Sequence, residues 1–305
     1  MHVSEHLTRA ALAAARDASA SPLERAQMLM EIAMGLQRRP KSAAELRDAI
    51  ALYDEALGLC GPEEELLIAR IAARRGTALQ ALPEEGTETL EQARAAFEAA
   101  LPVLGRCGRA EELAEAEMNL GLVLQHLAGA GRAKLADAIA AYQRALRTFD
   151  AARYPAEYAI LQNNLATAFL AMSGSDERAK MREAMAVQCF EQALKVVTLI
   201  DHPTEYAMLQ NNLGNALQYA SSSHALENNL RAIAAYDEAL KVRTRSARPL
   251  EHANTLANKA NCLWNLGERE RACACYAEAH EIFTAHGERE KARVVAEALA
   301  ELEAC

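Results

Sequence analysis

The stretch AIAAYDEAL, residues 232–240, is one of six copies of a single pattern along the chain. In each copy an alanine is followed four residues later by Tyr or Phe, and three residues after that by a second alanine. The first alanines are Ala49, Ala93, Ala138, Ala186, Ala232 and Ala272. Their successive separations are 44, 45, 48, 46 and 40 residues. Self-similarity at this period predicts an array of stacked structural units.

A second apolar segment precedes each copy of the pattern. In the last repeat, the small residue Ala260 lies twelve residues before Ala272, Leu263 falls between them at a core spacing, and Gly267 marks a turn. Helical periodicity runs through both segments, so each repeat is predicted to be a helical hairpin. The six aromatic residues are predicted to be core residues of the second helices, packed against their own first helices.

This arrangement resembles the tetratricopeptide repeat family, which pairs a small residue in its first helix with Ala, aromatic and Ala in its second. The resemblance is closest in the sixth repeat, at Ala260, Leu263, Ala272, Tyr276 and Ala279. It implies an all-α fold, a right-handed α-solenoid of about six helical hairpins with capping helices at both ends. The chain is then a single elongated domain over residues 1–305, with the first helices lining a concave groove.

Prolines and turns indicate the boundaries of the units. The hairpins are expected at about 23–58, 62–105, 110–150, 155–200, 203–246 and 249–286. Pro62, Pro155, Pro203 and Pro249 are each expected to open a first helix, where the missing N–H costs no hydrogen bond. Residues 4–18 are expected to form a leading helix. A terminal capping helix is expected over 288–303, with its inward face formed by Val294, Val295, Ala298 and Leu302.

Composition and charge argue against several classes of function. The net charge of −9 disfavours a nucleic-acid partner or an anionic membrane surface. The N-terminal residues lack a signal-peptide pattern, and no apolar run approaches transmembrane length. An odd number of irregularly spaced cysteines favours a reduced, cytoplasmic compartment. No motif indicates a cofactor, and Cys273 and Cys275 face different sides of a helix, which disfavours a shared metal.

Asparagines recur two residues before the small residue of the first helix in the last four repeats. They are Asn119, Asn164, Asn212 and Asn258. Asparagine is unfavourable inside a helix, so its recurrence calls for a reason. In the family this register points into the groove. Helices about 8–10 Å apart would place one amide at about every third residue of an extended peptide. Because an amide both donates and accepts, this asparagine ladder is predicted to bind the peptide backbone.

The same register indicates further groove residues, which are Asn215, Asn261, Gln125 and Arg74. The pairs Asn163-Asn164 and Asn211-Asn212 resemble the paired asparagines of kinesin light chain, whose groove asparagines clamp a ligand backbone. Two alternatives stay open. The ladder amides could bond a neighbouring helix and fix the stacking, and Arg74 could lie on a solvated helix face.

The favoured function is therefore a non-catalytic adaptor that binds an extended peptide or a partner segment in its concave groove. One alternative is a ligand-sensing regulatory protein whose superhelix flexes on binding. Another is a scaffold that self-associates into a homo-oligomer. An enzyme is disfavoured because no nucleophile or acid–base pair stands out in the sequence.

Overall fold

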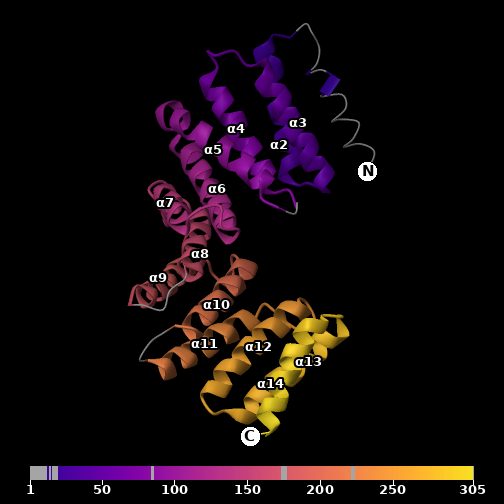
Figure 1. Ribbon diagram of the computed structural model, residues 1–305, viewed down its shortest axis with the longest axis vertical. Helices are drawn as coiled ribbons and strands as arrows, with labels where there is room; N and C mark the ends of the chain where they lie inside the picture. The colour runs from indigo at the N-terminus through magenta and orange to yellow at the C-terminus, as the bar shows by residue number, and fades with distance from the viewer. Residues whose placement is uncertain are drawn as a thin grey trace. The chain divides into compact units, whose positions relative to one another are not determined.

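The computed structural model describes residues 12, 13, 15, 20–83, 86–172, 177–220 and 224–304, and all regular structure within them is helical (Figure 1). The chain divides into two compact units, Met1–Asp150 (unit 1) and Ala151–Cys305 (unit 2). Unit 1 contains α2 (Pro22–Arg38), α3 (Ala43–Leu59), α4 (Glu65–Gln80), α5 (Glu88–Cys107), α6 (Ala110–Gly129) and α7 (Leu135–Ala145). Unit 2 contains α8 (Pro155–Ala171), α9 (Glu177–Leu194), α10 (Pro203–Gln218), α11 (Ala225–Leu240), α12 (Pro249–Asn265), α13 (Arg269–Ala285) and α14 (Arg289–Ala304).

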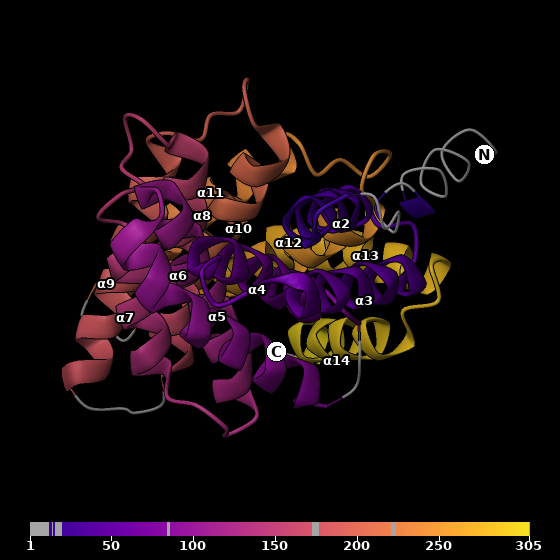
Figure 2. The ribbon, with the colours of Figure 1, turned by 90° about the horizontal axis from the view of Figure 1, so that it is seen from above.

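Consecutive helices pair into hairpins in both units. The pairs are α2 with α3, α4 with α5, α6 with α7, α8 with α9, α10 with α11, and α12 with α13. Figures 1 and 2 both show α10 and α11 running side by side. Inside each unit, the first helix of a hairpin packs on the second helix of the hairpin before it. The predicted all-α solenoid of six helical hairpins is confirmed, whereas the single elongated domain stays a prediction.

The repeat pattern forms the core of every hairpin, as predicted. All six aromatic residues are buried: Tyr53, Phe97, Tyr142, Phe190, Tyr236 and Tyr276. The tyrosine rings lie so close to the first helix that a Cβ atom on Gly121 would come within 2.5 Å of Tyr142. A Cβ atom on Gly214 would come equally close to Tyr236, at 2.5 Å. Only glycine leaves room for the ring at these two positions.

The first repeat departs from the expected register. Gly35, fourteen residues before Ala49, is the small residue that the sequence pattern predicts for this first helix, but a Cβ atom on Gly35 would meet nothing within 4 Å. Ala33, two residues earlier, is fully buried and takes the role of the small residue. The sequence alone did not distinguish the two because both are small and lie only two positions apart in α2.

Three of the four proline predictions are confirmed, since Pro155, Pro203 and Pro249 are the first residues of α8, α10 and α12. The fourth is wrong, because α4 begins three residues after Pro62, at Glu65. The turn at Gly267 is confirmed by its φ of 76°, a left-handed conformation that glycine adopts readily.

The predicted terminal helix is present as α14 and packs on α13. Val295 and Leu302 are buried, but Val294 is 52% exposed, so its expected inward orientation is wrong. A helix turns by about 100° per residue, so α14, which packs on α13, buries only one of two adjacent valines. Apart from residues 12, 13 and 15, the predicted leading helix over residues 4–18 lies outside the described residues. None of the helices that the structure describes has the length and apolarity to cross a membrane.

Candidate functional site

Unit 2 contains two junctions built from equivalent positions. The α8–α10 junction consists of α8, the link 195–202 and α10, and the α10–α12 junction consists of α10, the link 241–248 and α12. Each pair of first helices opens at a proline, so positions in the two junctions can be matched by counting from Pro203 and Pro249. Val197 then corresponds to Arg243, Leu209 to Thr255, Glu205 to Glu251 and His202 to Arg248.

A pocket of about 320 Å³ opens in the α8–α10 junction. Apolar side chains form most of its wall, and they include Ile160, Val197, Met208 and Leu209. Ile160 is 49% exposed and Met208 is 38% exposed, which is unusual for large apolar residues on adjacent helices. The pocket therefore offers apolar surface that a ligand side chain can cover.

Polar side chains border the same pocket. Asn163 and Asn164 contribute from α8, and His202 and Glu205 contribute from the link and the first turn of α10. Glu205 is exposed and has no ion pair or hydrogen bond within the described part of the chain. This carboxylate is therefore available to a ligand.

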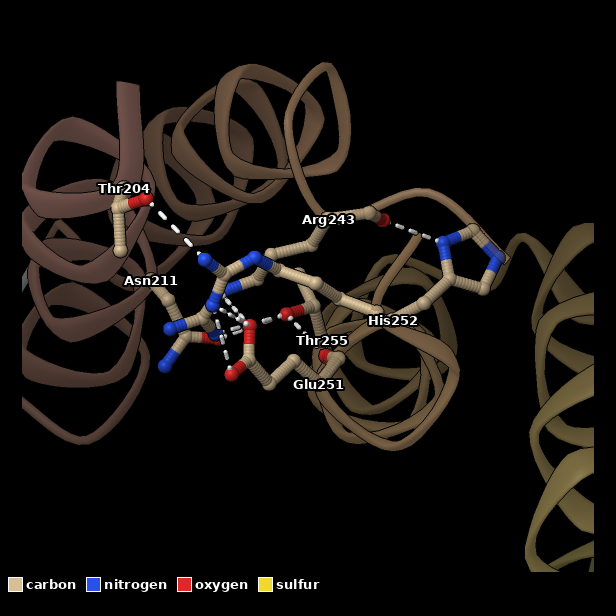
Figure 3. A network of polar contacts seen from close by, with 7 residues as sticks. Thr204, Asn211, Arg243, Glu251, His252 and Thr255 are labelled. Atoms are coloured by element: carbon tan, nitrogen blue, oxygen red, sulfur yellow. Dashed lines mark hydrogen bonds and ion pairs between the residues drawn. The ribbon is translucent and has the colours of Figure 1, made fainter. Parts of the chain in front are cut away.

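The α10–α12 junction holds arginine side chains at the equivalent place (Figure 3). Arg243 replaces Val197, and its Nη1 atom donates to the hydroxyl of Thr255 at 3.1 Å. Arg248 donates to both carboxylate oxygens of Glu251 at 3.1 and 3.2 Å, and to the hydroxyl of Thr204 on α10 at 3.2 Å. Arg243 thereby connects the link to α12, and Arg248 connects the start of α12 to α10.

The rest of this polar network is buried. Thr255 is fully buried. Its hydroxyl lies 3.1 Å from Oδ1 of Asn211 and 2.9 Å from the backbone oxygen of Glu251, and these two acceptors share its one proton. Burial lowers the pKa of Arg243, and the nearby carboxylate of Glu251 opposes that shift. His252 fixes the link from the other side, because its Nδ1 atom lies 2.7 Å from the backbone oxygen of Arg243.

The four ladder asparagines are half-buried on first helices of the two units. Asn119 donates to Oγ1 of Thr77 on α4 at 3.2 Å, and Asn212 donates to Oδ1 of Asn163 on α8 at 3.2 Å. These two amides therefore bond the preceding first helix, which is the stacking role left open by the sequence. Asn164 accepts a bond from Asn163 at 3.3 Å.

Hydrogen-bonding capacity nevertheless remains on the ladder in unit 2. The amide nitrogen of Asn164, the amide oxygen of Asn212 and the whole amide of Asn258 have no protein partner within the described residues. An amide carries two donors and one oxygen with two lone pairs. These three residues can therefore both donate to and accept from a bound chain.

The structure resembles solved repeat proteins. No protein-family model and no curated protein matches the chain. The tetratricopeptide repeat sensor protein of the STAND ATPase class from Pyrococcus horikoshii superposes with a TM-score of 0.56 at 12% identity. This match covers 88% of this chain and 42% of that chain. The chain has a tetratricopeptide-repeat fold.

A second tetratricopeptide-repeat structure, a thermophilic protein from Thermus thermophilus, matches with a TM-score of 0.46 at 21% identity. That match covers 76% of this chain and 99% of that chain. At these identities the similarity concerns the fold alone.

In this tetratricopeptide-repeat fold, three predicted groove residues bind the tyrosine of their own hairpin. Tyr142 donates its hydroxyl to Gln125 at 2.9 Å, Tyr236 lies 2.8 Å from Oδ1 of Asn215, and Tyr276 donates to Asn261. Burial raises the pKa of Tyr276 to about 12, so its hydroxyl stays protonated. Gln125, Asn215 and Asn261 therefore hold the hairpins together, whether or not they also meet a ligand.

The sequence itself contains a signal for these bonds. An amide lies one or four residues after the small residue in every repeat whose aromatic is tyrosine. The first repeat follows the same rule once its register is corrected, because Gln37 lies four residues after Ala33 and accepts from Tyr53 at 2.6 Å. Sequence reasoning considered each helix separately and so did not connect the amide with the ring.

Arg74 meets a carboxylate, but one that belongs to the chain. Its Nη1 atom lies 2.7 Å from Glu115 on α6, and Arg70 lies 2.9 Å from Glu112 on the same helix. Burial raises the pKa of Glu112, but the hydrogen bonds from Arg70 and from the backbone of Arg109 outweigh it and lower the pKa. These ion pairs join α4 to α6, as expected of residues that stabilise the stacking of hairpins.

Proposed function

We propose that the protein is a non-catalytic interaction module that binds an extended segment of a partner polypeptide along the first helices of unit 2. The observation that carries this proposal is the pocket of about 320 Å³ in the α8–α10 junction, bordered by Asn163 and Asn164. Apolar surface beside a few polar groups is the usual composition of a ligand site. We include in this proposal that the paired asparagines, which resemble those of kinesin light chain, bind the backbone of the partner segment.

Backbone recognition would come from Asn164, Asn212 and Asn258. Each has an unused donor or acceptor, and together they occupy one register on α8, α10 and α12. An extended peptide presents N–H and C=O groups that such amides can bind without reading the side chains. The asparagine bond to a neighbouring helix supports this arrangement, because it holds Asn212 and Asn163 in one orientation.

The test begins with affinity capture of partners, followed by titration of synthetic segments of the captured protein. The variants are Asn164→Ala and Asn258→Ala, and the control is Asn228→Ala, a half-buried asparagine on the second helix α11. If each amide makes a buried bond to the ligand, each loss costs about 1–3 kcal/mol of binding free energy. The expected dissociation constant rises by roughly 5- to 150-fold, with no change for the control.

Equal affinity of both ladder variants and the wild type for the same segment would remove the ladder from the site. Binding that survives only with the intact, folded partner would instead contradict recognition of an extended segment. Sedimentation of the unliganded protein over a range of concentrations tests the self-associating scaffold directly.

A further inference from the structure

We propose that the pocket of the α8–α10 junction accepts one bulky apolar side chain of the bound segment, and that a lysine or arginine next to it pairs with Glu205. This inference rests on the proposed function and adds a sequence preference to it. The ladder reads only the backbone, whereas this pocket would select the partner.

The size and lining of the pocket favour an apolar side chain. Pockets for whole ligands span roughly 300–1,000 Å³, so about 320 Å³ suits one or two side chains of a longer chain. Ile160 on α8 and Met208 on α10 both line the pocket and are partly exposed, so an apolar side chain bound there can cover them. Asn163 and Asn164 also line this pocket. Their side-chain amides, which would bind the ligand backbone, therefore lie beside the place for the apolar side chain.

The charge at the pocket favours a cationic neighbour. In the α10–α12 junction, the carboxylate of Glu251 forms an ion pair with Arg248 at 3.1 Å and lies 3.9 Å from the guanidinium of Arg243. The equivalent Glu205 has His202 and Val197 in place of those arginines, and it has no partner among the described residues. A cationic side chain of the partner would pair with Glu205 in the same way that Arg248 of this chain pairs with Glu251.

The α10–α12 junction also serves as an internal precedent. There a long side chain, Arg243, extends from the link to Thr255 on α12 and is only 14% exposed (Figure 3). The same hairpin geometry therefore admits a long side chain between link and first helix. At the α8–α10 junction the residues Val197 and Leu209 are too short to fill that space.

Methionine methyl groups provide a direct reporter. With ¹³C-methyl-methionine labelling, Met208 reports on the pocket, and Met181, which is 66% exposed on α9, serves as a control away from it. The probes are three acetylated, amidated Gly/Ser heptapeptides that carry Leu-Lys, Leu-Glu or Ser-Lys at their centre. Each is titrated into the whole chain to millimolar concentration.

The Leu-Lys peptide is expected to shift the Met208 signal in a saturable manner and to leave Met181 unchanged. The Leu-Glu peptide is expected to bind about threefold more weakly, as for an exposed charge pair. The Ser-Lys peptide is expected to bind at least about tenfold more weakly, because it lacks the buried side chain. Glu205→Gln is expected to remove the difference between Leu-Lys and Leu-Glu.

Two variants block the pocket while keeping every ladder asparagine. Val197→Arg with Leu209→Thr transfers the residues of the α10–α12 junction, and Ile160→Arg places a charge at a half-exposed site that tolerates it. Both are expected to abolish the Met208 response to Leu-Lys. Ile160→Arg keeps the test decisive if the double variant does not fold.

An equal Met208 response to Ser-Lys and Leu-Lys would overturn the proposal, and so would an unchanged titration in Ile160→Arg. In either case, continued sensitivity of the captured partner to Asn164→Ala would leave the proposed function standing. A saturable Met208 response combined with full insensitivity to the ladder variants would support the pocket and contradict the ladder.

Discussion

The α8–α10 and α10–α12 junctions are built from matched sequence positions but differ in the side chains at those positions. One is an apolar pocket walled by Val197 and Leu209, and the other holds a polar network around Arg243 and Thr255. The comparison teaches that matched positions can carry different interiors, with Val197 and Leu209 lining an apolar pocket where Arg243 and Thr255 take part in a polar network.

The polar junction needs more residues than the apolar one. A buried charge is tolerated only when it is paired and its remaining hydrogen-bonding groups are satisfied. Arg243 is therefore accompanied by Glu251, Thr255 and Asn211, each of which bonds another member of the network. Val197 and Leu209 require no such partners, and Glu205 has no partner among the residues that the structure describes.

The largest expected effect is that of Leu209→Thr, which introduces the polar residue without its network. Leu209 is 1% exposed, so the variant should lose about 3 kcal/mol of unfolding free energy, as for other large-to-small core substitutions. Urea unfolding measures the loss, and Leu226→Thr, at a site 67% exposed, serves as the control with a change under about 0.5 kcal/mol. Adding Val197→Arg should recover part of the loss, and strict additivity would contradict the equivalence of the two junctions.

Arg243→Val is the converse test, since it places the apolar residue in the polar junction. The variant removes the donor to the Thr255 hydroxyl and the 3.9 Å contact with Glu251, which keeps its bonds from Arg248. It should cost about 2 kcal/mol, less than for a fully buried pair because Glu251 is 45% exposed. Arg245→Val is the matched control, because Arg245 pairs with Glu281 at the surface and its loss should have a clearly smaller effect on stability. Equal losses for the two arginines would show that the network contributes nothing beyond a surface pair.

Thr255→Val should have a smaller effect. It keeps the shape of the side chain but leaves Oδ1 of Asn211 without its donor, which should cost about 1.5 kcal/mol. Asn211→Ala combined with Thr255→Val should cost less than the sum of the single variants, because both remove the same bond. Thermal or urea unfolding of the four proteins gives the coupling, and a value near zero would argue against that bond.

The smallest effect is expected from the pH dependence of Cys262, which is buried on α12. Alanines occupy the equivalent positions of α8 and α10, namely Ala168 and Ala216. Burial raises the pKa of the Cys262 thiol from its ordinary value to about 12. As the pH rises, the unfolded chain therefore loses this proton before the folded chain does. The contribution of the neutral thiol to the free energy of unfolding is full below about pH 9 and declines as the pH rises toward 12.

Between pH 8 and pH 10 this thiol should account for about 1 kcal/mol of lost stability. Cys262→Ala should lose less stability over the same interval, as followed by urea unfolding at each pH. Identical pH profiles for the two proteins would mean that the thiol is accessible to water in the folded state.

Much of the fold could be predicted from the sequence, because the repeat pattern is local. The spacing of Ala232, Tyr236 and Ala239 requires one helix, and the small residue Gly214 upstream fits the ring. The predictions failed where a local pattern was ambiguous, as at Gly35 against Ala33 and at Val294 against Val295.

The sequence by itself determined six hairpins, their core aromatics and the register of the asparagines, since these follow from periodicities within about one repeat. Only the tertiary structure decided what the polar side chains contact. Asn212 bonds Asn163 and Arg74 bonds Glu115 across separations of more than forty residues, and a helical register is compatible with either a ligand or a neighbouring helix. The choice depends on distances between hairpins, which no single helix encodes.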